Sequence, residues 1–207
     1  MIELLIVDDS RIMREALIRL FKQSNQYRVF ASIENAANAE IICMRNRIDL
    51  ILMDVCTADD ESGLVASKNI KKYYPEIKIV IMTSMPEYSF IEKARDAGCN
   101  GFIYKDMGED AILKACDEVM HDRFIWPENT PVVKIGLASS SDFTERELEI
   151  LRAMVQGKSY EEIANQFFIS INTVKWHIKN IQQKTGYNKS AQLIVDVISK
   201  QLILPKF

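Results

Sequence analysis

Several residue types are scarce in this chain of 207 residues, and each scarcity excludes a class of protein. With seven glycines and five prolines, the chain is neither collagen-like nor of low complexity. Its four cysteines and two histidines form no CxxC pair and no zinc-type cluster, so we expect reduced thiols. No apolar run approaches the roughly 18 residues that a membrane span requires. These absences predict a soluble, cytoplasmic protein with no membrane partner.

The charge of the chain is unevenly divided between its two parts. The formal net charge is −3, with 17 Lys and Arg against 22 Asp and Glu in residues 1–141 (−5) and 9 against 7 in residues 142–207 (+2). Residues 163–195 contain no acidic residue. This division predicts an acidic module joined to a module that binds an anion. The acid-free stretch contains Lys175, Lys179, Lys184 and Lys189.

Short apolar runs alternate with amphipathic stretches up to about residue 123. Continuous apolar strands separated by helices are typical of a parallel sheet that is covered on both faces. Five such units predict an α/β doubly wound domain with a five-stranded parallel sheet, in which ligands bind beyond the carboxyl ends of the strands. The expected strands are 3–8, 27–33, 49–55, 77–83 and 101–104, and the expected helices are 11–24, 35–47, 63–74, 87–97 and 108–122.

Between residues 124 and 141 the pattern lapses, and prolines, a glycine and three consecutive serines predict a linker. The stretches TERE (144–147) and SYEE (159–162) then match capping boxes, in which a Ser or Thr and a Glu satisfy backbone donors at a helix start. We therefore expect a domain over 1–123, a linker over 124–141 and a small all-α domain over 142–207. Its four helices are expected near 145–156, 160–167, 171–184 and 190–201.

Acidic residues end two of the expected strands. The first strand runs into Asp8 and Asp9, and the third runs into Asp54. Carboxylates that meet at one sheet edge repel one another, and Mg²⁺ relieves the repulsion by accepting their oxygens. Two other strand ends supply Thr83 and Lys105. Ordinary strand-end or capping acids are the alternative, but the combination favours a pocket for phosphoryl transfer to Asp54.

The order of these motifs resembles a known family. The amino-terminal part carries LIVDDS, LILMDV, IVIMTS and DAGCNGFIYKD, which resemble the motifs of response-regulator receiver domains. The carboxyl-terminal part carries FTERELEILRAMVQGKSYEEIA and ISINTVKWHIKNI, which resemble a LuxR-type helix-turn-helix domain. The whole chain thus resembles a NarL/FixJ-family response regulator. This implies a flavodoxin-like receiver in which a sensor histidine kinase phosphorylates Asp54 and so controls DNA binding and transcription.

The resemblance also implies a ligand set for the metal. It implies that Mg²⁺ binds to Asp9, Asp54 and the backbone carbonyl of Cys56, with Asp8 assisting through a water molecule. A protein of this kind is not an enzyme beyond its own phosphoryl transfer and dephosphorylation. The resemblance further implies that Lys105 pairs with the phosphoryl group, that Thr83 donates to it and that Phe102 takes the switch-aromatic position.

One loop departs from the family pattern. Relatives usually have a Pro in the loop after the acceptor and a Gly eight residues after it, whereas VCTADDESG has no Pro and places Gly63 nine residues after Asp54. The insertion Asp59-Asp60-Glu61 is acidic. A harmless solvated loop is the favoured interpretation, because surface loops tolerate insertions. The alternative is a loop that alters metal affinity or the lifetime of the phosphorylated state.

The stretch SINTVKWHIKNIQQKTG predicts a recognition helix capped by Ser170. At 3.6 residues per turn, Ile171, Val174, Ile178 and Ile181 share one face and are expected in the core. Amide and cationic side chains without an acid occupy the other face, which suits the major groove of double-stranded DNA. A solvated basic face is the alternative. The expected DNA-binding residues are Asn172, Thr173, Lys175, Trp176, Lys179 and Gln183.

The last expected helix, SAQLIVDVISKQL, is apolar over more than half of its circumference. A small domain buries so wide a face with difficulty, so the helix either pairs with a second copy or packs inside the domain, and the sequence alone supports the two almost equally. The family resemblance favours pairing and implies a homodimer on activation.

Two other functions are compatible with parts of the pattern. A phosphatase of the haloacid-dehalogenase type also uses an aspartyl phosphate, Mg²⁺ and a Lys, but its acids alternate, whereas Asp8 and Asp9 are adjacent. A DNA-binding regulator with an atypical receiver that is not phosphorylated is the second alternative, and the acidic loop leaves it open.

Overall fold

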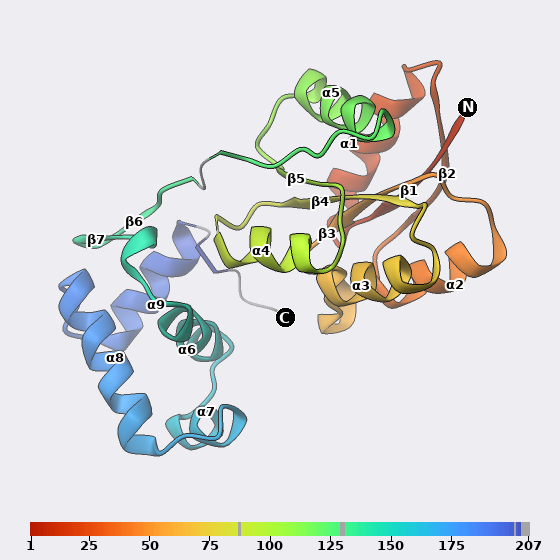
Figure 1. Ribbon diagram of the computed structural model, residues 1–207. Helices are drawn as coiled ribbons and strands as arrows, with labels where there is room; N and C mark the ends of the chain where they lie inside the picture. Colours follow the sequence, from red (N-terminus) through yellow and green to blue (C-terminus); the bar gives the residue numbers. More distant parts are fainter. Residues whose placement is uncertain (87, 129–130, 201, 204–207) are drawn as a thin grey trace. The chain divides into compact units, whose positions relative to one another are not determined.

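A computed structural model of the protein describes residues 1–86, 88–128, 131–200 and 202–203. The described residues form two compact units, the first built mainly from residues 1–84 and 88–128 and the second mainly from residues 131–203. The first unit is a parallel sheet covered by helices, and the second is largely helical (Figure 1). The expected fold class is therefore confirmed, whereas the domain boundaries 1–123 and 142–207 stay a prediction.

The sheet of the first unit has five parallel strands in the order β2-β1-β3-β4-β5. The order reverses between β1 and β3, so the crevice at this reversal lies at the carboxyl ends of these two strands, where α/β sheets bind ligands. Each expected strand is present to within one residue at either end. The strands are β1 (Ile2–Val7), β2 (Tyr27–Ile33), β3 (Leu50–Asp54), β4 (Lys78–Thr83) and β5 (Gly101–Tyr104).

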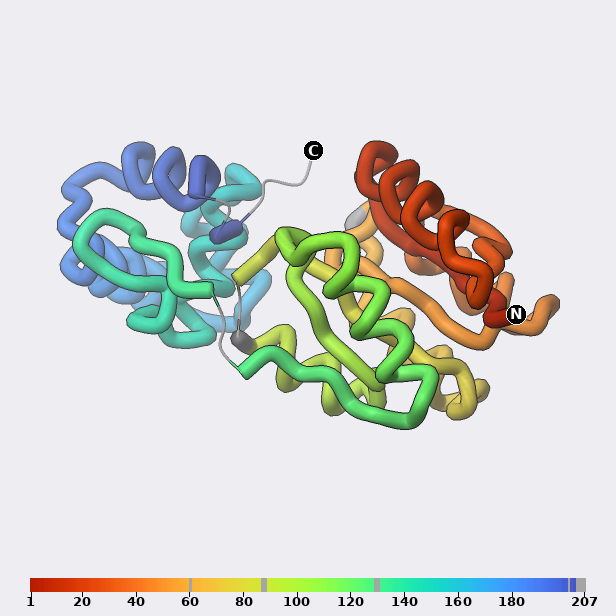
Figure 2. Tube along the Cα trace, turned by 90° about the horizontal axis from the view of Figure 1, so that it is seen from above, coloured from red at the N-terminus to blue at the C-terminus, as the bar shows by residue number. Residues whose placement is uncertain are grey.

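Helices cover both faces of this sheet. One face is covered by α1 (Arg11–Lys22) and α5 (Glu109–Met120), and the other by α2 (Ala37–Arg45), α3 (Gly63–Tyr73) and α4 (Tyr88–Asp96) (Figure 1, Figure 2). Burying the continuous apolar strands between two helical layers is the main source of stability, at roughly 1.5–3 kcal/mol for each large side chain. The core beneath α1 and α5 includes Leu4, Ile6, Leu50, Leu52, Leu20 and Phe21.

The chain does not leave the sheet directly after α5. Ile125 pairs with the outer edge of β5 as an isolated parallel bridge: its N–H donates to Asn100 O at 3.2 Å and its carbonyl accepts from the Phe102 N–H at 2.8 Å. The guanidinium of Arg95, on α4, lies 4.9 Å from the centroid of the Trp126 ring. The beginning of the expected linker is thus attached to both β5 and α4.

The second unit begins with a short hairpin within the same expected linker. Strands β6 (Lys134–Ile135) and β7 (Ala138–Ser139) pair in antiparallel fashion, and Ile135 and Ala138 are buried with the helices. Gly136 has a φ of 58°, and a Cβ there would lie 2.1 Å from the carbonyl oxygen of Thr185. Part of the expected linker over 124–141 therefore forms a hairpin, which the sequence pattern did not indicate because two-residue strands leave no periodic signal.

Four helices complete the second unit: α6 (Glu145–Val155), α7 (Tyr160–Gln166), α8 (Ile171–Thr185) and α9 (Ser190–Ser199). Both predicted capping boxes are confirmed, since Thr144 and Ser159 each accept from the backbone N–H three residues ahead and are capped in return by a Glu side chain. All four cysteines of the chain are free thiols. In the described part of the chain, none of the helices combines the length and the apolar character needed to cross a membrane.

Candidate functional site

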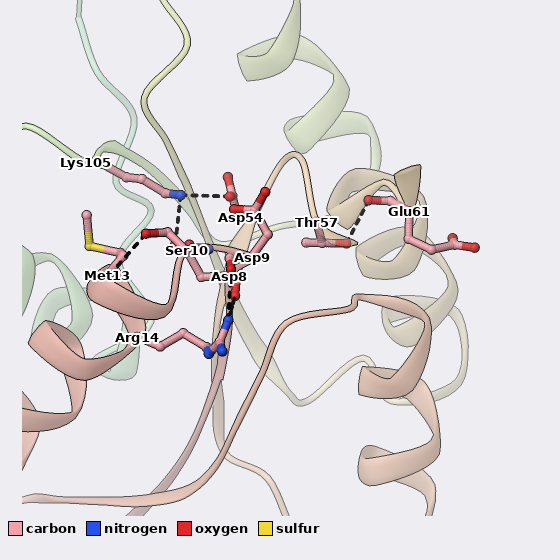
Figure 3. A network of polar contacts seen from close by, with 9 residues as sticks. All are labelled: Asp8, Asp9, Ser10, Met13, Arg14, Asp54, Thr57, Glu61 and Lys105. Atoms are coloured by element: carbon pink, nitrogen blue, oxygen red, sulfur yellow. Dashed lines mark hydrogen bonds and ion pairs between the residues drawn. The ribbon is translucent and has the colours of Figure 1, made fainter. Parts of the chain in front are cut away.

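The carboxyl ends of β1 and β3 bring three carboxylates together (Figure 3). Oxygen atoms of Asp8, Asp9 and Asp54 lie within 4.8 Å of one another. Asp8 and Asp54 are buried, whereas Asp9 is exposed. The ammonium of Lys105, which follows β5, lies 2.7 Å from Asp54 Oδ2 and 2.8 Å from Asp8 Oδ2. The acids and the lysine that the sequence predicted to meet do meet.

The electrostatics of this cluster follow from its burial. Burial raises the pKa of the Asp54 carboxyl to about 7; the Lys105 ammonium opposes this rise and the Asp8 carboxylate adds to it. Burial likewise raises the pKa of Asp8, against the opposing effect of Lys105. Burial alone would lower the pKa of Lys105, but Asp54 and Asp8 raise it above its ordinary value. Three carboxylates lie together and Lys105 pairs with two of them, so the site favours a further cation.

The donor set suits a hard divalent cation. The three carboxylates offer oxygen ligands, and an exposed Asp9 leaves one side of the cluster accessible to water, as Mg²⁺ requires. Cys56 is half-buried two residues beyond Asp54, in the turn that leaves β3, and forms an isolated bridge with Ser62. The three carboxylates therefore fit a magnesium site, and the share of the Cys56 carbonyl in the ligand set stays a prediction.

Arg14 is a site residue that the sequence analysis missed. Its Nη1 donates to the carbonyl oxygens of Asp8 at 2.7 Å and Asp9 at 3.0 Å (Figure 3). Ser10 also fixes this turn, since its N–H donates to Asp8 Oδ1 at 2.9 Å and its side chain caps α1. A basic residue one turn into the helix after the acids was the available signal. Arg14 and Ser10 together fix the backbone from which Asp8 and Asp9 project.

The acidic loop after β3 is ordered by backbone and threonine contacts. The Thr57 hydroxyl donates to Glu61 O at 2.8 Å (Figure 3). It also accepts from the Ala36 N–H at 3.0 Å. Asp59 has a φ of 60°, and its carboxylate accepts from the Asn35 side chain at 2.9 Å. The additional residue is therefore taken up by a 3₁₀ turn over residues 58–60. Thr57 and Asn35 were not predicted to matter.

The two remaining predicted residues lie on β4 and β5. Thr83 is buried at the carboxyl end of β4, and its carbonyl accepts from the Lys105 N–H at 2.8 Å. Phe102 is buried on β5, with its ring 5.4 Å from that of Tyr104 in an edge-to-face arrangement. Thr83 thus lies on the strand next to β3, and Phe102 lies one strand further out, where its N–H donates to the carbonyl of Ile125 beyond α5.

In the second unit, α7 and α8 form two helices joined by a tight turn. The Phe167 N–H donates to Ile163 O and the Ile169 N–H donates to Ala164 O, which closes α7. Phe168 follows with a φ of 55°, and its side chain is 95% exposed. Ser170 caps α8 by accepting from the Thr173 N–H at 3.1 Å, as predicted. This is the geometry of a helix-turn-helix, in which the second helix enters the major groove.

The polar face of α8 is exposed, as its pattern predicted. Val174, Ile178 and Ile181 are buried on the opposite face. Ile171 is 37% exposed, so its expected place in the core was wrong: it is the first residue of the helix, where the packed face has only begun. Thr173 is half-buried because it also contacts the Ser170 hydroxyl at 2.8 Å. The other predicted DNA-binding residues, all exposed, are Asn172, Lys175, Trp176, Lys179 and Gln183.

Two cations of the second unit serve its internal structure. Lys184 Nζ lies 2.7 Å from the carboxylate of Glu147, which is 3% exposed, and donates to Asp142 O at 2.8 Å. The Arg146 guanidinium lies 4.5 Å from the centroid of the Phe167 ring and donates to the Phe167 carbonyl at 3.1 Å. Arg146 therefore holds the turn before α8, a role that the sequence analysis did not identify.

Comparisons with known proteins agree with this geometry. Residues 4–117 match the response regulator receiver domain, and residues 141–197 match bacterial regulatory proteins of the luxR family. The transcriptional regulatory protein DegU of Brevibacillus brevis is 27% identical and covers 95% of this chain and 93% of its own. The oxygen regulatory protein NreC of Staphylococcus aureus is 26% identical, and the match covers 97% of this chain and 99% of NreC. A structure of the RcsB response regulator of Salmonella typhimurium has a TM-score of 0.59 at 19% sequence identity. The match covers 94% of this chain and 98% of the RcsB chain.

The chain therefore belongs to the response-regulator family, with a receiver domain followed by a LuxR-type DNA-binding domain. Its similarity to DegU and NreC over nearly the whole length places it with the NarL/FixJ group, as the motifs predicted. The family match favours this class over the dehalogenase-type alternative.

Proposed function

We propose that Asp54 accepts a phosphoryl group from a sensor histidine kinase and that this modification controls binding to promoter DNA. The observation that carries the proposal is the convergence of Lys105 with Asp54 and Asp8, at 2.7 and 2.8 Å, beside the exposed carboxylate of Asp9. A carboxylate oxygen of Asp54 attacks the phosphorus of a phosphohistidine, and the bond from phosphorus to the histidine nitrogen breaks. The histidine leaves with the electron pair.

The residues around Asp54 have distinct roles in this step. Lys105 neutralises charge on the transferred oxygens, and the Thr83 hydroxyl donates to one of them once the phosphoryl group is in place. Asp8, Asp9, Asp54 and the Cys56 carbonyl would hold Mg²⁺, which would offset the negative charge of the phosphoryl oxygens and carboxylates. Transfer adds about two negative charges at a buried position, and this drives the rearrangement of Thr83 and then of Phe102.

The output is binding of α8 to the major groove of double-stranded DNA. In this proposal Lys175, Trp176 and Lys179 contact base edges, and Asn172, Thr173 and Gln183 contact flanking bases or phosphates. A solved structure of RcsB contains two dimers bound to two parallel DNAs, which supports a dimer on DNA here as well. We assign the dimer contact to α9, where Val195 is 66% exposed although Leu193 and Val197 are buried within the unit.

The proposal is tested by incubating the full chain with acetyl phosphate and Mg²⁺ and measuring the intact mass. Wild type gains the mass of one phosphoryl group, and Asp54→Ala does not. Asp59→Asn, in the same acidic loop, is the matched control and is modified like wild type. Modification of Asp54→Ala to the same extent overturns the assignment of the acceptor.

The coupling to DNA needs a second measurement. DNA fragments that bind the phosphorylated protein are first selected from a random library. We expect these fragments to bind at least about tenfold more tightly to the phosphorylated protein than to the unmodified protein. Fluorescence anisotropy at one fixed salt concentration measures both affinities. Equal affinity in both states, with Asp54 verifiably phosphorylated, would support the regulator with a phosphorylation-independent receiver.

A further inference from the structure

A second pocket of the first unit lies at the edge of the sheet opposite the aspartates. Its volume is about 560 Å³, within the range of small-molecule sites. Its lining comes from the end of α3, the end of α4 and the turn before β5, and the segment after α5. Because these residues precede β4 and β5 or follow α5, the pocket is separate from the site at the carboxyl ends of the strands. The lining residues include Lys71, Pro75, Arg95, Phe124 and Trp126.

The pocket contains two cations and none of its described lining residues is acidic. Lys71 Nζ donates to the carbonyl oxygens of Pro75 at 3.1 Å and Ile77 at 2.6 Å. An ammonium has three donors, so one remains for a ligand. Lys71 forms no ion pair with any described residue. Burial lowers its pKa, since its charge is partly removed from water, and the charge of Glu76 opposes this to a smaller extent. A partly desolvated cation with no carboxylate within ion-pair distance favours an anionic ligand.

Arg95 contributes the second cation in a fixed orientation. Its guanidinium lies over the ring of Trp126, 4.9 Å from the centroid. Within the described part of the chain, no carboxylate or carbonyl accepts a hydrogen bond from it. A stacked guanidinium keeps its N–H donors at the edge of the group, where they bind a carboxylate in bidentate fashion.

Two aromatic side chains form a wall beside these cations. Phe124 is 65% exposed and Trp126 is half-buried. The backbone between them is fixed, because Ile125 is hydrogen-bonded to β5 on both sides and packs its side chain against the core. In an extended segment the residues on either side of Ile125 point away from the core face. Phe124 and Trp126 are thereby presented together on the pocket side.

We propose that this pocket binds a small organic anion with a carboxylate attached to a flat aromatic ring. The carboxylate lies between Lys71 and Arg95, and the ring packs against Phe124 and Trp126. The cations supply charge-assisted hydrogen bonds and the aromatic wall supplies apolar contact, which together select for a ligand that has both parts. The proposal does not depend on the phosphorylation of Asp54.

The sequence has two tryptophans, Trp126 and Trp176. The test uses the full chain with Trp176→Phe, so that Trp126 alone gives the tryptophan fluorescence. Benzoate is titrated by ligand-observed NMR and by Trp126 fluorescence, with benzamide as the neutral isostere and acetate as the anion without a ring. Benzoate binds saturably with a Kd of about 1 mM or tighter. Benzamide and acetate each bind at least about tenfold more weakly.

Variants separate the pocket from general effects. Arg95→Gln and Lys71→Gln each weaken benzoate binding at least about fivefold. Lys72→Gln, which removes an exposed charge from the adjacent position of α3, leaves it unchanged. If Lys71→Gln lowers the melting temperature, Lys71→Arg, which retains the charge, is tested in its place. Absence of saturable benzoate binding, equal affinity for benzamide, or equal effects of the Lys71, Arg95 and Lys72 variants would overturn the proposal.

Discussion

A Cβ atom added to Gly63 would lie 1.8 Å from the carbonyl oxygen of Asp54. The N–H of Gly63 also donates to the carbonyl of Val55 at 3.0 Å. The first residue of α3 therefore closes directly against the backbone of the proposed phosphoacceptor. This relationship explains why the longer acidic loop still ends in glycine: the 3₁₀ turn takes up the additional residue, and the close approach to Asp54 is kept.

Gly63→Ala is expected to destabilise the receiver domain by about 3 kcal/mol or more, because the overlap is with backbone that cannot move without displacing β3. Urea denaturation followed by far-UV circular dichroism measures the change. Gly108→Ala is the matched control, since a Cβ at Gly108 meets nothing within 4 Å and its φ of −63° suits any residue. A loss of less than about 1 kcal/mol for Gly63→Ala would contradict the close approach.

The stability of the metal-free protein is expected to fall as pH rises from about 4 to about 7. The pKa of the Asp54 carboxyl is about 7 in the folded chain, against 3.8 in the unfolded chain. Between these two pH values the folded state therefore binds a proton at Asp54 more tightly than the unfolded state does. The resulting stabilisation is complete below the lower value and is lost above the higher one. Asp54→Asn lacks this titration.

The free energy of unfolding is measured by urea denaturation in EDTA at about pH 5 and about pH 8. From the lower to the higher pH, the free energy of unfolding of Asp54→Asn is expected to rise by roughly 1–3 kcal/mol relative to that of wild type. Saturating Mg²⁺ should remove most of this gain, because the metal compensates the carboxylate charge. A difference between wild type and variant that does not change with pH would show that Asp54 titrates normally.

Arg14→Met is expected to weaken Mg²⁺ binding about tenfold although Arg14 does not touch the metal ligands' carboxylates. Its two hydrogen bonds hold the carbonyls of Asp8 and Asp9, and without them the turn that presents both carboxylates relaxes. Arg11→Met is the control on the same helix, because Arg11 is exposed and pairs with Glu15 alone among the described residues. Isothermal titration with Mg²⁺ at fixed pH compares them. Equal affinities for the two variants would refute the positioning role.

Local signals made much of the fold predictable. The caps Thr144, Ser159 and Ser170 act within three residues of their own position, so the sequence alone identified each helix start. The acids at the ends of β1 and β3 were predictable for a different reason. Parallel strands bring their carboxyl ends to one edge whatever the loops do, and this placed Asp8 and Asp54 together.

The features that sequence patterns missed depend on contacts between distant segments. The hairpin of β6 and β7 is fixed by Thr185, about fifty residues away, whose carbonyl accepts from the Leu137 N–H at 2.9 Å. Arg14 and Lys184 carry no local sign of whether they bind a ligand or the chain itself. Ile171 follows the helical period but lies at the helix end, where periodicity does not determine burial.

Lys179 and Lys184 provide the sharpest separation between binding and folding on α8. Both belong to the acid-free stretch, but Lys179 is exposed, whereas Lys184 is paired with the buried Glu147. Burial would raise the pKa of Glu147, yet hydrogen bonds from Lys184 and Thr144 hold that pKa below its ordinary value. Lys184→Ala is therefore expected to lower the free energy of unfolding by about 1–3 kcal/mol, since it leaves a buried carboxylate without its cation.

Lys179→Ala is expected to leave stability within about 0.5 kcal/mol of wild type and to weaken specific DNA binding by about 1–3 kcal/mol if Lys179 contacts a base. Thermal denaturation and fluorescence anisotropy on the selected DNA, each at one salt concentration, measure the two quantities for both variants. Repeating the titrations over a range of salt separates base from phosphate contact, because loss of a phosphate contact lowers the salt dependence. The assignment would be reversed if Lys179→Ala bound DNA like wild type while Lys184→Ala folded normally and bound DNA poorly. Lys184 would then be the DNA-binding residue of the two.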